Sequence, residues 1–255
     1  MKQNEIAVTL YTVRNFCQNE KDLFDSLNKI KKIGYNAIQV SSIGPIDPKN
    51  VKKMCDDIGL IICATHEPNN EIIHHTEKVI EKLNILDCNF TALPYPQDIN
   101  FIDIDILDTF IKNINKAGAI FKQYNKILCY HNHALEFQKI NNELILDRIY
   151  NNTDSQLIQG EPDIYWIQKG GQNPISWCKK LKNRLPLIHL KDFIMLNEND
   201  SYYAEIGEGN LDIKNIIKEA KSSGCKWYIV EQDECKGDPF TSLEISYNNL
   251  LNFVI

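Results

Sequence analysis

Residues 6–41 read IAVTLYTVRNFCQNEKDLFDSLNKIKKIGYNAIQVS, and this stretch contains one complete strand–helix–strand unit. Apolar, β-rich runs at 6–13 and 37–41 predict two strands. The apolar residues between them recur every three to four positions: Leu23, Leu27, Ile30 and Ile33. This spacing predicts an amphipathic helix that ends at Gly34, where glycine can adopt the left-handed cap. A helix between two strands indicates that the strands are parallel.

The same alternation continues to the end of the chain. Six further apolar runs predict strands, at 60–66, 90–94, 126–133, 157–163, 187–191 and 227–231. Intervening helices are expected to end near glycines Gly59, Gly118 and Gly224. Eight strands that alternate with helices predict an α/β fold, a single (β/α)8 TIM barrel over residues 1–255. An open, doubly wound sheet is the structural alternative.

The composition fits one globular domain and disfavours two kinds of partner. Of the 255 residues, 43% are hydrophobic and 24% are charged, which is enough apolar material for a large core. The net charge of −6 argues against a nucleic-acid partner, because such partners are held by basic surfaces. No apolar run reaches the roughly 20 residues of a membrane span. We expect no partner of either kind.

The eight cysteines form no CxxC pair, and several lie inside apolar runs. This pattern is typical of buried, reduced thiols in a reducing compartment. The polar residues 1–6 lead into an apolar segment that is too short for a signal sequence. The sequence therefore predicts a cytoplasmic protein.

Acidic residues and histidines gather where the predicted strands end. Active sites of TIM barrels lie at the carboxyl ends of the strands. The set comprises His66, Glu67, His131, His133, Glu136, Glu161, Asp163, His189, Lys191, Asp192, Glu231 and Asp233. Burying such groups is costly unless each has a partner, and a metal ion would be one. Glu161, which precedes Pro162, is expected to orient a neighbour by hydrogen bonding.

Strand alternation places several of these side chains on a common face. Glu136, Asp163, His189 and Glu231 are predicted to converge from four neighbouring strands as ligands of one divalent metal ion. Three carboxylates and one imidazole favour Mn²⁺, with Mg²⁺ or Co²⁺ as alternatives, over a structural zinc, which prefers thiolates. Zn²⁺ in a catalytic role stays open.

Seven motifs stand out along the chain: LYTVR (10–14), YHNHALEF (130–137), DIYW (163–166), HLKDF (189–193), IGEGN (206–210), VEQD (230–233) and SYNNL (246–250). Together they resemble the xylose isomerase-like sugar phosphate isomerases/epimerases of the AP endonuclease 2-like superfamily. The resemblance runs from about residue 6 to the C-terminus, with the motifs in order. It implies a TIM barrel with a small-molecule, sugar-like substrate.

The resemblance also implies a Glu, Asp, His, Glu metal site. Asp163, His189 and Glu231 match that pattern. Glu136 departs from it, because it lies closer to Asp163 than expected and beyond the predicted strand, so His131 is the alternative ligand. Related endonucleases carry a histidine three residues after the strand-six aspartate, where this chain has Trp166. That difference disfavours a role in DNA repair.

The resemblance and the residues together predict an isomerase or epimerase of a ketose or keto-sugar. A metal-bound carbonyl would acidify the adjacent C–H and give an enediolate. Glu136 and Glu231 would move the proton, and His131 or His133 would relay it. Five residues are expected to contact the substrate: Tyr11, Arg14, His66, Trp166 and Lys191.

Two other functions remain open. The same intermediate could expel water or an aglycone from a keto-inositol or keto-sugar, which would make the enzyme a lyase or dehydratase. A sugar-binding barrel without activity is the non-catalytic alternative. No basic cluster indicates a phosphate on the substrate, and a homo-oligomer is compatible with the sequence.

Overall fold

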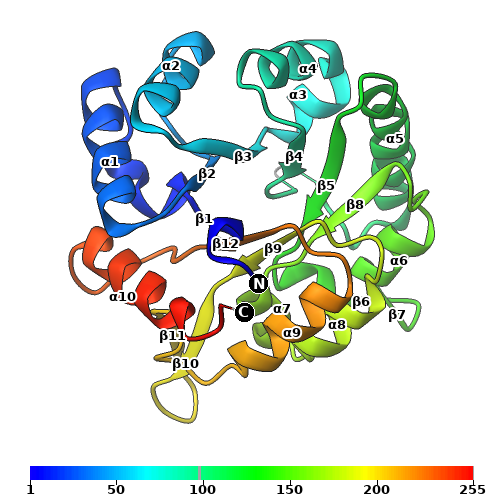
Figure 1. Ribbon diagram of the computed structural model, residues 1–255. Coiled ribbons are helices and arrows are strands. Elements are labelled where there is room, and N and C mark those ends of the chain that lie inside the picture. The colour runs from blue at the N-terminus through cyan, green and yellow to red at the C-terminus, as the bar shows by residue number, and fades with distance from the viewer. Residues whose placement is uncertain (97–98, 255) are drawn as a thin grey trace.

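The computed structural model describes residues 1–96 and 99–254, and eight parallel strands form one nearly closed barrel (Figure 1). In sequence order they are β1 (Ile6–Thr9), β2 (Ala37–Val40), β3 (Ile61–His66), β4 (Phe90–Leu93), β5 (Ile127–His131), β8 (Ile158–Glu161), β9 (Leu187–Leu190) and β12 (Trp227–Val230). Their order around the barrel is β8-β5-β4-β3-β2-β1-β12-β9. The predicted TIM barrel is confirmed.

The barrel closes between β8 and β9. Asp163 and His189 form an isolated parallel bridge there, and the amide of His189 donates to the carbonyl of Pro162 at 3.0 Å. Two of the predicted metal ligands therefore lie at the closing seam, where backbone pairing fixes their separation.

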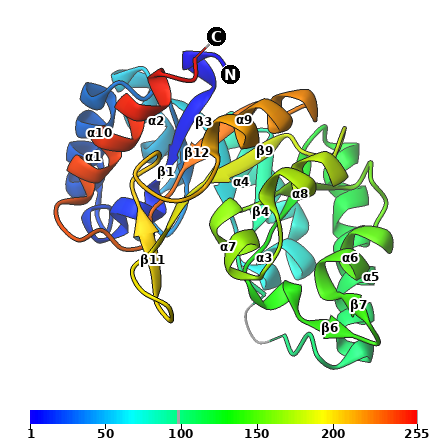
Figure 2. The same ribbon diagram turned by 90° about the horizontal axis from the view of Figure 1, so that it is seen from below.

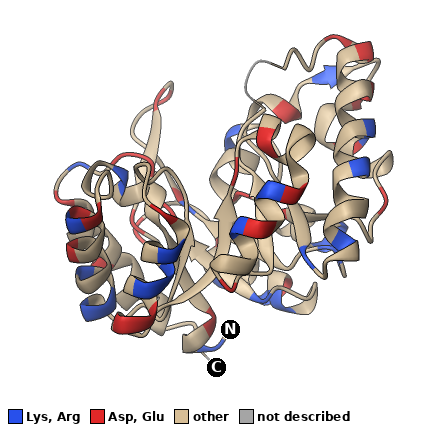
Figure 3. Cartoon of the chain, turned by 90° about the horizontal axis from the view of Figure 1, so that it is seen from above, with Lys and Arg blue, Asp and Glu red and all other residues tan. Residues whose placement is uncertain are grey.

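Helices cover the outside of the barrel. They are α1 (Glu20–Ile33), α2 (Pro48–Ile58), α3 (Asn69–His74), α4 (Thr76–Ile85), α5 (Ile104–Gln123), α6 (Ile145–Asn151), α7 (Ile164–Lys169), α8 (Pro174–Lys180), α9 (Ile213–Ser222) and α10 (Pro239–Leu251). Three short 3-10 helices accompany them: η1 (Gln3–Glu5), η2 (Leu10–Phe16) and η3 (Leu135–Phe137). In Figure 3 basic and acidic residues are interspersed along the outer helices.

Two hairpins are added to the barrel. One consists of β6 (Lys139–Ile140) and β7 (Glu143–Leu144), and the other of β10 (Asp192–Met195) and β11 (Ser201–Ala204). The second hairpin projects from the body of the molecule, and the two termini lie side by side (Figure 2). Within residues 1–96 and 99–254, no helix combines the length and apolarity that crossing a membrane requires.

Glycines end helices at three of the four predicted places. Gly34 and Gly59 follow α1 and α2 with positive φ, and Gly224 lies just beyond α9 with φ +99°. The prediction for Gly118 was wrong, because this residue is inside α5. A Cβ at Gly118 would lie 2.8 Å from the carbonyl oxygen of Leu157, so the glycine permits close packing of α5 on the chain before β8.

The first predicted strand is shorter than expected. β1 ends at Thr9, whose hydroxyl accepts a hydrogen bond from the amide of Tyr11 and caps η2. This local bond competes with strand pairing. Tyr11 and Arg14 consequently lie on a helical turn beyond the strand.

The barrel interior changes from apolar to polar along the strands. Its first half is filled by Ala7, Ala37, Cys63, Ala64, Phe90, Ala92, Cys129, Leu187 and Ile229. Two positions further along their strands lie Gln39, His131, His189 and Glu231, all buried. All eight cysteines are free thiols, as predicted, with Cys225 and Cys235 partly exposed and the others buried.

Candidate active site

A pocket of about 910 Å³ opens at the carboxyl end of the barrel strands. The five predicted substrate-contacting residues all line it: Tyr11, Arg14, His66, Trp166 and Lys191. Three of the predicted catalytic residues also line it: His131, His133 and Glu231. The pocket therefore brings together most of the catalytic and substrate-contacting residues that the sequence singled out.

Four side chains converge beside this pocket. Ligand atoms of His131, Asp163, His189 and Glu231 all lie within 4.8 Å of one another, and all four residues are buried. Nδ1 of His189 is 2.8 Å from Oε2 of Glu231. His131 lies on β5, His189 lies on β9, Glu231 directly follows β12, and Asp163 lies at the seam after β8.

Two buried atoms of this cluster form no hydrogen bond: Nδ1 of His131, and Oδ2 of Asp163, which lies 3.4 Å from Nζ of Lys191. The other oxygen of Asp163 accepts the amide of Trp166 at 3.0 Å and so caps α7, which fixes the carboxylate. Unsatisfied buried polar atoms are costly and indicate a missing partner. Two imidazoles and two carboxylates fit a divalent metal ion.

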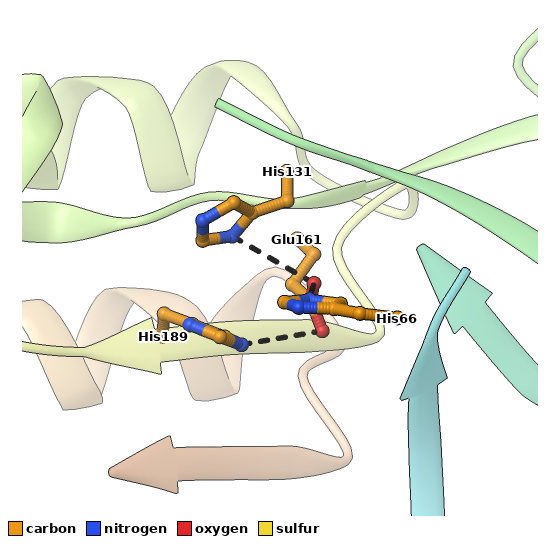
Figure 4. Close-up of side chains that lie close together, drawn as sticks. All are labelled: His66, His131, Glu161 and His189. Carbon is orange, nitrogen blue, oxygen red and sulfur yellow. Dashed lines mark hydrogen bonds and ion pairs between the residues drawn. The ribbon is translucent and has the colours of Figure 1, made fainter. Parts of the chain in front are cut away.

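A second group surrounds Glu161, at the end of β8. Figure 4 shows His66, His131 and His189 around this carboxylate. Nε2 of His66 lies 2.7 Å from Oε2, and Nδ1 of His131 lies 3.7 Å from the same oxygen. The predicted orienting role of Glu161 agrees with these contacts.

Lys191 brings a positive charge to the carboxylates. Its buried Nζ is 3.4 Å from Asp163, 3.3 Å from Glu231 and 2.5 Å from Asp233. It also lies 4.8 Å from the ring centre of Trp166. Burial alone would lower the pKa of Lys191, but the carboxylates outweigh burial and raise it, so the lysine stays charged.

Burial and the attraction between opposite charges also shift the pKa values of three other buried groups. Burial alone would lower the pKa of His189, but Glu161 and Glu231 raise it to about 10. Burial alone would raise the pKa of Glu161, but His189 and His66 hold it at about 2. For Asp163, burial prevails over Lys191 and raises the pKa to about 7. The site thus holds closely paired charges away from water, an arrangement common at functional sites.

The structure places Glu136 elsewhere than predicted. This buried residue lies on η3, where Oε1 accepts the hydroxyl of Tyr130 at 2.8 Å and Oε2 accepts the amide of His133 at 2.9 Å. Among the described residues, it belongs to neither group of potential ligands. Because η3 turns the chain after β5, the carboxylate points to its own loop, and His131 takes the strand-five place in the cluster.

Gln39 was not singled out from the sequence. This buried residue donates from Nε2 to Oε1 of Glu161 at 2.7 Å and accepts from Nε2 of His189 at 2.8 Å. A polar residue inside the apolar run Ala37–Val40 was the signal that could have indicated it.

The loop 207–209 does not offer its amides to a phosphate. The amides of Gly207 and Gly209 donate to Oδ2 of Asp192 at 2.9 and 3.2 Å, and the amide of Leu211 donates to Oδ1 at 3.2 Å. A Cβ at Gly209 would lie 2.3 Å from Oδ1 of Asp192. The loop is therefore wrapped around an internal carboxylate.

Known proteins share this fold and parts of the sequence. An inosose dehydratase from Clostridium tetani is 28% identical over 147 residues, which are 50% of this chain and 48% of that protein. A second one, from Clostridium beijerinckii, is 24% identical over 144 residues, 50% of this chain and 48% of that protein. The chain spans about half the length of these curated relatives in the matches.

Solved structures match over nearly the whole chain. A sugar phosphate isomerase/epimerase from Parabacteroides distasonis superposes with a TM-score of 0.83 at 25% identity, covering 98% of this chain and 94% of that one. A xylose isomerase-like TIM barrel protein from Mycobacterium smegmatis, in complex with magnesium, has a TM-score of 0.77 at 11% identity, covering 99% and 98%. The family model for the xylose isomerase-like TIM barrel matches residues 27–245. The chain belongs to the xylose isomerase-like TIM barrel family.

Proposed function

We propose that this protein is a divalent-metal-dependent isomerase or epimerase of a ketose or keto-sugar. One observation carries the proposal: the convergence of His131, Asp163, His189 and Glu231 beside a pocket large enough for a sugar. The family acts on sugars, and the acidic net charge gives no support for a nucleic-acid substrate.

His131, Asp163, His189 and Glu231 would hold the ion. Bound there, a divalent ion supplies Lewis acidity toward a substrate carbonyl, which acidifies the neighbouring C–H. Mn²⁺ is our first choice, and Mg²⁺, Co²⁺ and Zn²⁺ are compatible with this mixed nitrogen and oxygen donor set. Lys191 balances part of the carboxylate charge whether or not the ion is present.

Proton transfer needs groups that reach the substrate. Glu231 lines the pocket from the end of β12, and His131 and His133 line it from the end of β5. We assign the proton transfer to Glu231, with His131 or His133 as the relay. Glu136 does not line the pocket, so we give it the task of holding the His133 amide in place.

Residues in the wall of the pocket, among them Arg14 and Trp166, would orient the substrate. Arg14 donates to the carbonyls of Tyr11 and Asp233 at 2.9 and 3.0 Å, and its guanidinium lies 4.2 Å from the ring centre of Tyr11. A cation held in this way is suited to binding hydroxyl oxygens. Trp166 offers an aromatic face to the apolar side of a sugar ring.

A lyase is the second candidate, and the inosose dehydratase relatives favour it. Removal of the same proton, followed by loss of a group β to the carbonyl, would release water or an aglycone. His66 or His133, both at the pocket, could protonate the leaving group.

Two measurements test these proposals. Elemental analysis of the wild type, His189→Ala and Glu231→Ala should find about one divalent ion per wild-type chain and loss of it in both variants. Mass spectrometry of products from a panel of keto-sugars and keto-inositols then separates conserved mass, for an isomerase, from loss of water or an aglycone. A wild type that binds no metal after reloading contradicts the mechanism and leaves a non-catalytic sugar-binding barrel.

A further inference from the structure

Gln39 bridges two charged parts of the site. The residue is fully buried on β2, opposite the seam at which His189 and Asp163 pair. Its amide spans from Oε1 of Glu161 (2.7 Å) to Nε2 of His189 (2.8 Å). Both bonds use the one planar amide of Gln39, so the orientation of this amide sets the hydrogen-bond roles of Glu161 and His189 together.

The direction of these bonds follows from the chemistry of the groups. An ionised carboxylate can only accept hydrogen bonds, so Glu161 accepts from the Gln39 amide at Oε1 and from Nε2 of His66 at Oε2. The NH2 of Gln39 must then face Glu161, which turns its carbonyl oxygen toward His189. A carbonyl oxygen can only accept, so Nε2 of His189 carries a hydrogen.

The opposite ring nitrogen faces the metal cluster. Nδ1 of His189 lies 2.8 Å from Oε2 of Glu231. Without a metal ion, Nδ1 donates to this carboxylate. With Nε2 committed to Gln39, Nδ1 is the nitrogen that can give up its hydrogen for coordination. We propose that Gln39 is a positioning residue that keeps the hydrogen on Nε2 of His189, so that the divalent ion binds through Nδ1.

Reversal of the Gln39 amide would be costly. It would place the Gln39 oxygen against Oε1 of Glu161 and the NH2 group against an N–H of His189. Glu161 is itself held by His66, whose Nδ1 lies 3.2 Å from the hydroxyl of Ser41. A continuous chain of hydrogen bonds thus runs from Ser41 at the pocket to His189, and each member restricts the next. Such partners of a ligating histidine typically change metal affinity 10–100-fold when they are removed.

This inference rests on the metal site of the proposed function, and its test uses metal binding without substrate. The variants are Gln39→Met, which keeps the length but removes both bonds, and Gln39→Asn, which is too short to span both partners. Thr91→Val is the control, because Thr91 is equally buried on β4 and its hydroxyl bonds with Thr65. Circular dichroism and thermal melts check that each variant is folded.

The first readout is the dissociation constant for Zn²⁺, measured by competition with a chelating dye. We expect both Gln39 variants to bind about 10–100-fold more weakly than the wild type, with Thr91→Val close to the wild type. The second readout is ¹⁵N–¹H NMR of the imidazole rings in Zn²⁺-loaded protein. It should show the hydrogen of His189 on Nε2 and the metal on Nδ1.

Coordination of Zn²⁺ through Nε2 of His189 would overturn the inference. So would unchanged affinity in folded Gln39→Met and Gln39→Asn. If the wild type binds no metal, the proposed function fails together with this inference. If the wild type binds Zn²⁺ but turns over no sugar with any tested ion, only the proposed function fails, and the affinities still decide the role of Gln39.

Discussion

The two halves of the barrel interior are built from the same strands but contain opposite kinds of side chain. Ala37, Leu187 and Ile229 fill the first half. Two residues further along, Gln39, His189 and Glu231 form a hydrogen-bonded polar group that is equally buried. The apolar half excludes water from one side of the polar half, which strengthens electrostatic interactions there. We infer that the apolar half provides stability and propose that the polar half provides the chemistry.

Removal of a cluster ligand should have the largest effect, and on chemistry rather than folding. His189→Ala is expected to abolish stoichiometric metal binding and to lower kcat/KM by more than the about 10–100-fold that is typical for outer partners. Elemental analysis and steady-state kinetics measure both. If the His189→Ala variant keeps both its metal and its activity, the polar half of the barrel has no part in the mechanism.

Lys191→Met should destabilise the polar half itself. It leaves buried carboxylates without their cation, which costs about 3–5 kcal/mol for a broken buried pair. Urea unfolding with chelator should show this loss, and added metal should recover part of it, because the ion also neutralises the carboxylates. Wild-type stability in the presence of chelator would show that the lysine is dispensable.

Leu187→Ala tests the apolar half. A cavity directly behind His189 in the strand should cost about 2–5 kcal/mol of unfolding free energy. Metal stoichiometry in the folded variant should stay at the wild-type value. If this variant loses metal as His189→Ala does, the two halves do not have separate roles.

Glu136→Gln should change how stability depends on pH. Burial raises the pKa of Glu136 from 4.5 to about 7 in the folded protein, so the folded state holds this proton more tightly than the unfolded state. Ionisation therefore costs folding free energy as pH rises from about 4.5 through 7, with a limit of roughly 3 kcal/mol. Below pH 4.5 the group is protonated in both states and contributes no difference.

The glutamine variant cannot ionise, so its unfolding free energy should fall less than that of the wild type between pH 5 and pH 8. Chemical denaturation at several pH values measures this difference. Parallel profiles for the two proteins would mean that the Tyr130 and His133 bonds keep Glu136 ionised throughout.

The sequence by itself determined the strand–helix repeat, because apolar spacing reports which face of each element is buried. It also determined the strand-end residues Asp163, His189 and Glu231, since alternation fixes the side of the strand to which each points. These are local properties, set by neighbours within a few positions of the chain.

Only the tertiary structure decided whether Glu136 or His131 lies in the cluster with Asp163, His189 and Glu231. It also decided which groups Gln39 contacts. The 3-10 turn after β5 directs Glu136 to Tyr130 and His133, and no periodic pattern encodes that direction. Gln39 meets His189, 150 positions away, only because the barrel closes. Contacts across the barrel depend on closure and register together, and neither can be read from the residues on one strand.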